Sequence, residues 1–472
     1  MFKNRKAILL TILAVIFLFW FFLTKNNYFH WDEWHFLMSF NQPVALFLTK
    51  PYGEHYLPLN LLNHYLFFRF FGLNNSPFQI SVIIFHIINT FLLYKIIFRE
   101  TNKFALALLG LILFGISNVY NEDLIWSQGV SSVGSAMLIS LAFLTFLNFQ
   151  KHEKNVWLFV SLISLVLSPL FNAFGVLAPF TFIVISFLRV RNKILKKFSM
   201  ILYFLIGALN LFILFHFSGN QISNSTQKMS LEIFYKIPMF IIQGVVRGNV
   251  IRFFFPGLHL FQGNFQLFKY LFSLFFSLTA AILFFKYLID WLRNDHYRLA
   301  RITTLVSYLL LIIIGYFTAS LGRISYGLSQ ASIARYSYQS FFFLIILTLI
   351  ILKDQLKFKT IIVVSLFFWL INLYSLIHFE NDFWIVMVSR DRQFITDVSY
   401  LFNHNDTVYD FSAVGIYPTV KLSKLWFLYP SDKKINFIDP NLFYQKNSLI
   451  SGDLKSQEIY GKLLNDYQKK FD

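Results

Sequence analysis

"AILLTILAVIFLFWFFLT", residues 7–24, is the first of a series of long apolar segments that decide the fold. It follows Lys3, Arg5 and Lys6, a basic start that is similar to that of a signal peptide. The segment is longer than a typical signal-peptide core, and no small-x-small cleavage site precedes residues 25–31, "KNNYFHW". We therefore expect a retained membrane anchor whose N-terminus is cytoplasmic.

The composition extends this expectation to the whole chain. Hydrophobic residues make up 57% of the 472 residues and charged residues 14%, whereas soluble proteins carry roughly 25% charged residues. The formal net charge of +18 lies mostly in short connections and in the C-terminal tail, which favours membrane orientation over nucleic-acid binding. No cysteine is present, so disulfides and thiolate chemistry are excluded. The sequence predicts a polytopic α-helical protein of the plasma (inner) membrane that binds no nucleic acid.

Charge predicts how the chain is threaded through the bilayer. A spanning helix needs about 20 apolar residues, and about eleven segments are candidates. With a cytoplasmic N-terminus, the cytoplasmic connections are rich in lysine and arginine, whereas external loops 118–130 and 168–173 contain neither. This agrees with the positive-inside rule and makes "HWDEWHF", residues 30–36, external. After the first span, the expected spans are 78–98, 104–118, 130–148, 156–170, 173–189, 198–217, 267–289, 302–319, 337–352 and 360–378.

Residues 57–72, "LPLNLLNHYLFFRFFG", are apolar enough for a further span, which would invert every later loop. Asn60, Asn63 and His64 instead follow an i, i+3, i+4 spacing and form one polar stripe on a helix. We therefore expect an interfacial helix within the first external loop. The external segment 218–265 is expected to be partly embedded as well.

Residues 379–472 differ from the rest of the chain. They contain more charges, an Asp-Pro pair and short strand-like pieces such as "TVYDFSAVGIY", residues 407–417. We expect two parts: a transmembrane domain of residues 1–378 and a small external mixed α/β domain of residues 379–472.

The predicted topology gathers charged residues on the external side. Two acid pairs, Asp32–Glu33 and Glu122–Asp123, lie in the first two external loops. A carboxylate can act as general base on a hydroxyl, while arginine, lysine or a divalent cation can hold a lipid phosphate. Solvated loop acids and headgroup-binding arginines are the alternatives that the residues leave open. The other external candidates are Lys50, Glu54, His55, His64, Arg247, Arg252, His259, Arg323 and Arg335.

The order and sidedness of these features resemble the GT-C superfamily of membrane glycosyltransferases, which includes the protein O-mannosyltransferases and the lipid A aminoarabinose transferases. These families place an acid pair in the first external loop, here Asp32–Glu33, and follow it with interfacial helices. "YGEHYLPL", residues 52–59, is similar to the Glu-Lys-Pro-Pro-Leu string of the aminoarabinose transferases. Glu54 matches that string, and His55 stands in place of its lysine.

Two further segments carry the resemblance, which covers about residues 1–378. "FFGLNNSPFQISVIIFHIIN", residues 70–89, is similar to the stretch that leads into the second span of the family. "GRISYGLSQASIARY", residues 322–336, resembles Gly-Arg to Arg-Tyr strings of bacterial multi-pass proteins of this type. The resemblance thus implies a GT-C-like fold for the transmembrane domain.

The resemblance also implies an inverting hexosyl- or pentosyltransferase. Its donor would be a polyprenyl-phosphate-linked sugar, and its acceptor a glycan, lipid or protein at the external leaflet. Asp32 would be the catalytic base, with Glu33 or Asp123 assisting it or holding a cation, and Glu122 would be a further candidate catalytic acid. Asp32 and Asp123 would be the ligands if a divalent metal ion is a cofactor. The candidate substrate-binding residues are Lys50, Glu54, His55, His64, Arg247, Arg323 and Arg335, with His55, Arg323 and Arg335 placed at the donor phosphate.

Two other functions stay open on the sequence. A lipid-linked glycan polymerase or ligase would share the external arginines without depending on paired acids in the first loop. A flippase or transporter would line a path near the bilayer midplane with charged residues. The predicted spans contain almost no acids, and this disfavours transport.

Overall fold

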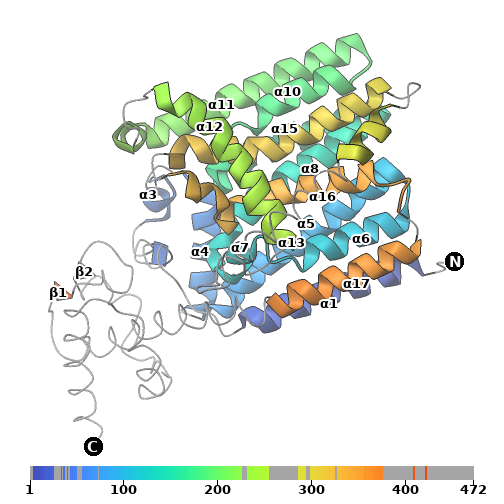
Figure 1. Cartoon of the computed structure of the whole chain (residues 1–472). Coiled ribbons are helices and arrows are strands. Elements are labelled where there is room, and N and C mark those ends of the chain that lie inside the picture. The colour runs from blue at the N-terminus through green and yellow to red at the C-terminus, as the bar shows by residue number, and fades with distance from the viewer. Residues whose placement is uncertain are drawn as a thin grey trace, which may run out of the picture.

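A bundle of mainly antiparallel helices makes up most of the part of the chain that the structure describes, as a computed structural model shows (Figure 1). Most helices are followed by a turn and a returning helix, so the connections gather at two opposite ends. The N-terminus lies at one of these ends. The structure describes residues 4–25, 33, 36–37, 40, 43–49, 51, 56–72, 74–225, 231–254, 285–293, 298–324, 327–356, 358–375, 408–409 and 420–421.

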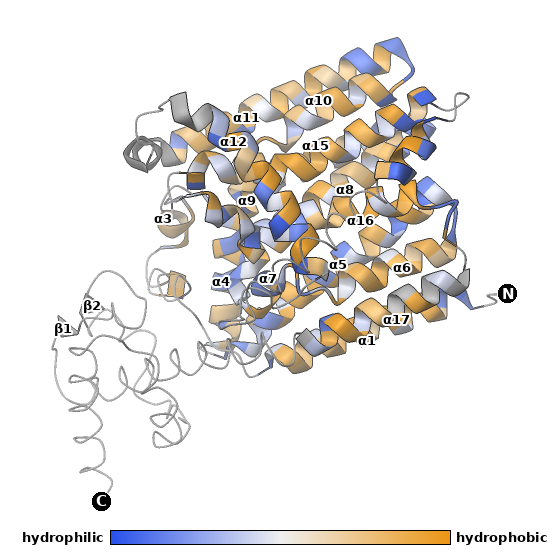
Figure 2. Ribbon diagram, viewed as in Figure 1, coloured by the Kyte–Doolittle hydropathy of each residue, from blue (hydrophilic) through white to orange (hydrophobic). Residues whose placement is uncertain are grey.

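Five of the described helices are long and apolar enough to cross a membrane. Apolar residues dominate the length of the bundle and polar residues gather at its ends (Figure 2), the pattern of a multi-pass membrane protein. The five are α1 (Arg5–Thr24), α5 (Ser76–Thr101), α8 (Val130–His152), α11 (Lys193–Ser225) and α15 (Arg298–Arg323). Further apolar helices are α6 (Phe104–Gly115), α9 (Asn155–Phe171), α10 (Ala178–Arg189), α16 (Tyr338–Ile351) and α17 (Phe358–Ser375).

These helices match the predicted spans in position. Every predicted span coincides with a described helix except 267–289, which lies mostly outside the described residues. Several of the helices are shorter than a bilayer requires. The helical class is therefore confirmed, and the count of eleven crossings stays a prediction.

Local sequence signals set the helix ends. Pro77 lies in the first turn of α5. Backbone N–H groups in this turn have no partner within the helix, so proline, which lacks an N–H, breaks no helical hydrogen bond there. The helix ends before Asn102, whose φ of 54° is left-handed, a conformation that asparagine tolerates better than most residues. Phe104 then begins α6, so a very short turn joins two antiparallel helices.

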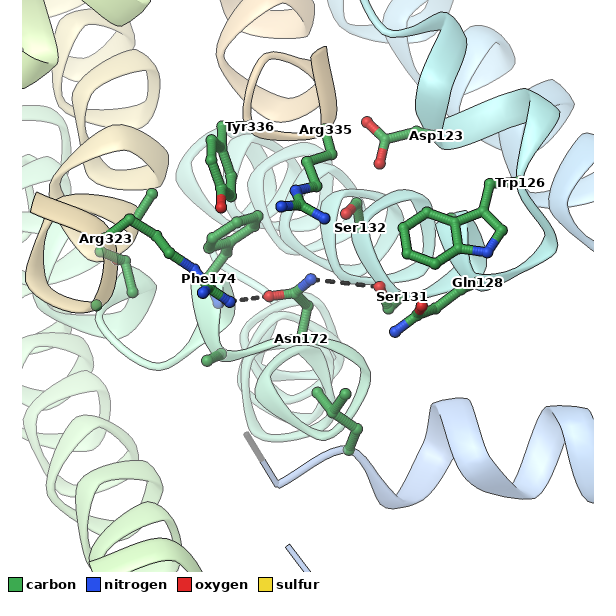
Figure 3. Close-up of a pocket in the computed structure, with 16 residues that line it drawn as sticks. Asp123, Trp126, Gln128, Ser131, Ser132, Asn172, Phe174, Arg323, Arg335 and Tyr336 are labelled. Atoms are coloured by element: carbon green, nitrogen blue, oxygen red, sulfur yellow. Dashed lines mark hydrogen bonds between the residues drawn. The ribbon is translucent and has the colours of Figure 1, made fainter. Parts of the chain in front are cut away.

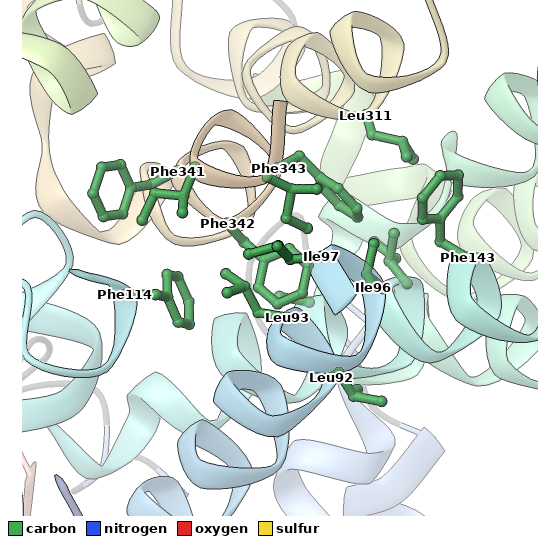
Figure 4. Packing of buried hydrophobic residues seen from close by; sticks show 14 of the residues in the cluster. Leu92, Leu93, Ile96, Ile97, Phe114, Phe143, Leu311, Phe341, Phe342 and Phe343 are labelled. Carbon is green, nitrogen blue, oxygen red and sulfur yellow. The ribbon is translucent and has the colours of Figure 1, made fainter. Parts of the chain in front are cut away.

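Aromatic side chains fill the centre of the bundle between α5, α6, α8 and α16 (Figure 4). Phe114 meets Phe342 edge to face with 5.3 Å between ring centroids, and Phe143 meets Phe343 in the same way at 5.8 Å. Such aromatic pairs stabilise a core beyond the area that they bury. The centre is therefore a packed scaffold that holds the loops at both ends.

Polar side chains inside the bundle bond to neighbouring helices. His86 of α5 bonds through Nδ1 to the Tyr338 hydroxyl of α16, 2.8 Å away, and through Nε2 to the Gly115 carbonyl, 3.1 Å away. Asn89 donates to the Val133 carbonyl of α8 at 2.9 Å. Hydrocarbon offers no water to such groups, so these bonds link the helices across the core.

A buried ion pair ties three helices together at the N-terminal end. Arg189 of α10 lies 2.9 Å from the Glu100 carboxylate of α5 and donates to the Ser307 hydroxyl of α15 at 3.0 Å. Tyr308, also on α15, donates to the same Glu100 oxygen at 3.3 Å. This cluster fixes the register of α5, α10 and α15 far from the opposite end.

At the opposite end of the bundle, short helices form part of the connections, whereas lysine- and arginine-rich turns form connections at the N-terminal end. Figure 1 shows α3 (Val44–Thr49), α4 (Pro58–Phe71) and α7 (Asn121–Ile125) at this end. The lysine- and arginine-rich turns, such as 189–197, belong to the N-terminal end. The two ends therefore differ in charge as the sequence predicts, while the compartment that each faces stays a prediction.

The predicted interfacial helix in the first loop is α4, and its polar stripe lies on a buried face. Asn60 and His64 are fully buried, and Asn63 donates to the Ser81 hydroxyl of α5 at 3.3 Å. Leu66, about 200° around the helix from His64, is 45% exposed. The polar stripe thus faces the protein, because it meets polar groups of the neighbouring segments, and the apolar face points outward.

The structure describes part of the segment expected to be embedded and little of the C-terminal domain. Within 218–265 the helix α12 (Leu231–Gln243), the π-helical segment η3 (Gly244–Ile251) and the short α13 (Arg252–Phe254) follow one another. Within 379–472, an antiparallel pair of strands, β1 (Val408–Tyr409) and β2 (Val420–Lys421), is described. The external α/β domain otherwise lies outside the described residues and stays a prediction.

Candidate active site

The second predicted acid pair lies on α7, which leads into the turn η1 (Ser127–Gly129). Gln79 of α5 donates to the Ile125 carbonyl at 2.9 Å and so holds the end of α7. Gly129 packs so closely on Asp123 that a Cβ there would lie 1.7 Å from the Asp123 carbonyl oxygen. Glycine is therefore required in this turn, which folds back over Asp123, a residue only 1% exposed.

A cavity of about 180 Å³ lies beside this turn (Figure 3). Typical ligand pockets measure roughly 300–1,000 Å³, so the cavity suits the polar head of a ligand better than a whole lipid. Segments that are far apart in the sequence form its wall, including η2 (Ala173–Gly175) and η8 (Ala334–Tyr336). The polar and aromatic lining residues are Asp123, Trp126, Gln128, Ser131, Ser132, Asn172, Phe174, Thr318, Arg323, Arg335 and Tyr336.

Two arginines supply the positive charge of the cavity. Arg323 stands at the last residue of α15, and Arg335 is in η8. The Arg335 guanidinium lies 5.4 Å from the ring centroid of Tyr336, a cation–π distance that helps to orient it. Figure 3 shows both arginines and Asp123 around the same space. The cavity therefore offers cations and a carboxylate to one ligand.

Neutral polar groups complete the wall. Asn172 donates to the Ser131 hydroxyl at 3.4 Å and accepts from the Phe174 backbone N–H at 3.2 Å, so its amide is held in place (Figure 3). Ser132 hydrogen-bonds to the Asp123 carboxyl. These groups can bond to hydroxyl or phosphate oxygens of a ligand.

Burial and charge act in opposite directions on Asp123. Burial is the larger effect and raises the pKa of the Asp123 carboxyl well above its usual value, and the neighbouring Glu122 raises it further. The hydrogen bond from Ser132 and the charges of Arg335 and Arg252 lower the pKa. Asp123 is therefore a more basic carboxylate than a solvated one, and the arginines favour its ionised form.

The loop that follows α1 reaches the same turn through Glu33. Glu33 is fully buried, and its carboxylate accepts a hydrogen bond from the Ser127 hydroxyl. Ser127 directly precedes Gln128 and Gly129, which line the cavity. The structure thus brings an acid of the first loop to the turn that carries Asp123, as the predicted sidedness requires.

His64 of α4 lies next to Glu33. Its Nε2 is 4.0 Å from the Glu33 carboxylate, and its Nδ1 is 3.0 Å from the Asn60 carbonyl. A carbonyl can only accept, so Nδ1 carries a proton and donates. Burial lowers the pKa of His64 to about 4, partly offset by this hydrogen bond, so the ring is neutral at pH 7.

The remaining predicted site residues either do not line the cavity or lie outside the described residues. Glu122 is half-buried next to Asp123, and its backbone N–H donates to the Asn121 side chain at 2.9 Å. Arg247 is exposed on η3 and does not line the cavity. Asp32, Lys50, Glu54, His55 and His259 lie outside the described residues.

The sequence did not single out the neutral residues of the wall. Gln128, Ser131 and Asn172 belong to the predicted external loops 118–130 and 168–173 or lie directly beside them. The sequence "NEDLIWSQG", residues 121–129, places the amide of Gln128 in the same short loop as Glu122 and Asp123. This proximity could have predicted that Gln128 belongs to the site. Neutral polar residues are common in loops, and this signal alone is therefore weak.

A metal site is not apparent among the described residues. Within the described ranges, no group of three or more histidines, aspartates and glutamates is placed to hold a metal ion. The predicted ligand Asp123 is described, while Asp32 lies outside these ranges. A divalent cofactor therefore stays a prediction.

Comparisons with known proteins gave one structural similarity. No family model matches the chain, and no curated protein matches its sequence. Among solved structures, the chain is similar to ArnT from Cupriavidus metallidurans bound to undecaprenyl phosphate, with 13% identity and a TM-score of 0.42. The match covers 84% of this chain and 72% of ArnT. Such a match gives no residue-by-residue correspondence, so the roles of residues must come from the site itself.

Proposed function

We propose that this chain is an inverting membrane glycosyltransferase that uses a polyprenyl-phosphate-linked sugar. One observation carries the proposal: buried Asp123 shares a cavity with Arg323 and Arg335 at the end of the helical bundle. A carboxylate and two cations suit a reaction in which a hydroxyl loses a proton while a phosphate leaves. A site at the bundle end lets the lipid tail of the donor remain in the bilayer.

The reaction forms one bond and breaks another at the anomeric carbon of the donor sugar. The acceptor hydroxyl oxygen attacks this carbon from the face opposite the phosphate, and the anomeric carbon–oxygen bond to the phosphate breaks. Both electrons of that bond leave with the polyprenyl phosphate. The hydroxyl proton passes to a carboxylate, which is Asp123 among the described residues and Asp32 by the sequence prediction.

Arg323 and Arg335 stabilise the leaving phosphate. Negative charge builds up on its oxygens as the bond breaks, and guanidinium groups donate strong charge-assisted hydrogen bonds to such oxygens. The Asn172 amide and the Ser131 hydroxyl can bond to sugar hydroxyls or to the phosphate. The acceptor, the sugar and the external compartment of the reaction belong to the proposal and follow the predicted topology.

The position of the charged residues, and whether activity requires the carboxylates, distinguish a transporter and a ligase from the proposed transferase. A transporter needs charged groups along a path through the membrane, whereas the described cavity lies at one end of the bundle. A ligase needs the arginines but not an acid pair in the first loop. A strict requirement for a carboxylate at position 123 therefore favours the transferase.

Transfer from polyprenyl-phosphate sugars tests the proposal in purified membranes. Undecaprenyl phosphate, carrying hexoses or pentoses in turn, is the probe. We expect Asp123→Asn to lower turnover by about 100-fold, the range for loss of a general base, and Arg335→Gln to lower it by at least about tenfold. Arg69→Gln is the control, because Arg69 is exposed on α4 outside the cavity.

Two results would contradict the proposal. One is full transfer activity in Asp123→Asn and Arg335→Gln at equal protein levels. The other is a failure of the wild-type protein to bind undecaprenyl phosphate, measured as co-purified lipid by mass spectrometry.

A further inference from the structure

We infer that Glu33 is a positioning residue: through Ser127 it holds the α7–η1 turn and thereby keeps Asp123 at the cavity wall. The sequence grouped Glu33 with the catalytic acids. The structure instead joins it to a backbone turn by way of a hydroxyl that the sequence did not single out. The kinetic part of this inference rests on the proposed function, and its structural part does not.

Burial makes the bond between Glu33 and Ser127 important for the turn. Both side chains are buried, at 0% and 1% exposure. A buried carboxylate needs donors, and a hydrogen bond to a charged group is stronger than one between neutral groups. The turn is therefore held to the first loop at Ser127 by a bond that water does not easily replace.

The turn transmits this contact to the cavity over very few residues. Gln128 and Gly129 follow Ser127 directly and line the cavity. Gly129 in turn lies against the Asp123 carbonyl with no room for a Cβ. A shift of Ser127 must therefore move the wall and the backbone of Asp123 together.

Gln79 and His64 also restrict the α7–η1 turn and Glu33, which is bonded to it. Gln79 of α5 holds the Ile125 carbonyl on the α7 side of Ser127. His64 of α4 lies beside Glu33, and its ring packs between Phe36 and Phe78 with centroid distances of 5.6 and 5.7 Å. The neutral His64 presents an unprotonated Nε2 toward Glu33, so an amide at position 33 could donate to it.

This geometry separates a positioning role from a base role. A glutamine at position 33 keeps an oxygen that accepts from Ser127 and gains an N–H for His64, but it cannot take a proton. An alanine loses the acceptor. A positioning Glu33 therefore tolerates Glu33→Gln and not Glu33→Ala, whereas a base tolerates neither.

The absence of cysteine makes an activity-independent test simple. Gln128→Cys places a single thiol on the cavity wall, and its rate of reaction with a small maleimide reports how well the wall is closed. In this background we expect Glu33→Ala and Ser127→Ala each to raise the labelling rate roughly tenfold, the effect of losing a buried charge-assisted hydrogen bond. Glu33→Gln should stay near the parent rate. The double change Glu33→Ala with Ser127→Ala should match the single changes, because one interaction is removed.

Glu100→Ala is the matched control. Glu100 is another acid with a buried partner, but it lies near the far end of α5, about 36 Å from the start of that helix. Its removal should leave the labelling rate unchanged. If Glu33→Ala yields no folded protein, Ser127→Ala carries the same test, because it removes the other half of the bond.

The kinetic arm uses the transfer assay. Glu33→Gln should keep kcat within a few-fold of the wild type, and Ser127→Ala should lower kcat more than it changes KM. The inference is overturned if Glu33→Gln is as inactive as Glu33→Ala, or if Ser127→Ala leaves labelling unchanged. A wild-type protein without transfer activity would contradict the proposed function alone, since labelling still decides the role of Glu33.

Discussion

The surroundings of Asp123 act in opposite directions on the charge of its carboxyl group. Its carboxyl is buried, which disfavours the charge, and two arginines nearby favour it. Such opposed environments are typical of functional carboxylates, because they raise basicity while keeping the group ionisable. The same environment has a cost in stability that can be measured.

We expect Asp123→Asn to stabilise the protein at neutral pH. The folded-state pKa of Asp123 is raised above its ordinary value of 3.8, so folding binds a proton that the unfolded chain releases above that value. Stability from this group is complete below pH 3.8 and is lost as pH rises toward the folded pKa. The melting temperature of Asp123→Asn in detergent should exceed that of the wild type at pH 7, and the difference should shrink toward pH 4.

Equal melting temperatures at all pH values would show that the carboxyl is not buried at this position. Ser132→Ala serves as a comparison, because it removes a bond that lowers the pKa of Asp123. It should increase the dependence of stability on pH.

The sequence predicted the charged residues of the cavity better than the neutral ones. Asp123, Arg323 and Arg335 were named as site residues from their sidedness, and all three line one cavity. Asn172 and Gln128 were not named, because amides are frequent in loops and no spacing distinguishes them. Arg247 was named on the same grounds of sidedness, and it lies outside the cavity.

At the level of elements, the α7–η1 turn joins the segment that follows α1 to the loop between α6 and α8. It is short, held by Gln79 on one side and Glu33 on the other, and closed by a glycine contact. Its geometry depends on contacts more than on helical propensity, since five residues are too few for a stable isolated helix.

Gly129→Ala should therefore damage the site while leaving the bundle folded. The new Cβ would meet the Asp123 carbonyl oxygen at 1.7 Å, so the backbone must move, at a cost of about 1–3 kcal/mol. We expect loss of most transfer activity and faster maleimide labelling of Gln128→Cys. Gly315→Ala is the control, because the nearest atom to a Cβ there is the Ser340 hydroxyl at 3.4 Å and Gly315 does not line the cavity. Normal activity of Gly129→Ala would show that the turn can open without consequence.

The helix α4 shows what periodicity can and cannot decide. The i, i+3, i+4 spacing correctly predicts one polar stripe on a helix of residues 58–71. The direction of the stripe depends on what packs against it, and here it faces Glu33 and Ser81. From the sequence alone, a polar stripe on a helix could face either water or polar groups inside the protein.

In the whole molecule, a stabilising ion pair and the candidate site lie at opposite ends of the bundle. The Arg189–Glu100 pair lies at one end and the cavity at the other. Both ends are tied to α5, so this helix links them mechanically.

Glu100→Ala should weaken the bundle without changing the chemistry. It leaves Arg189 buried without its carboxylate, and breaking one side of a buried pair costs about 3–5 kcal/mol. We expect a clear fall in melting temperature with turnover per folded molecule unchanged at low temperature. Exchanging both partners, as Glu100→Leu with Arg189→Met, should recover part of the loss. A selective fall in kcat would instead show that the far end communicates with the cavity.

The sequence by itself determined that the chain is a helical membrane protein, where most helices lie, and which end gathers the acids and arginines. Those properties follow from apolar length and local charge, which neighbouring residues set. Only the tertiary structure decided that Glu33 reaches Ser127, that the stripe of α4 turns inward, and that Asn172 joins the cavity wall. These contacts join residues far apart in the chain, and their geometry depends on how whole helices pack.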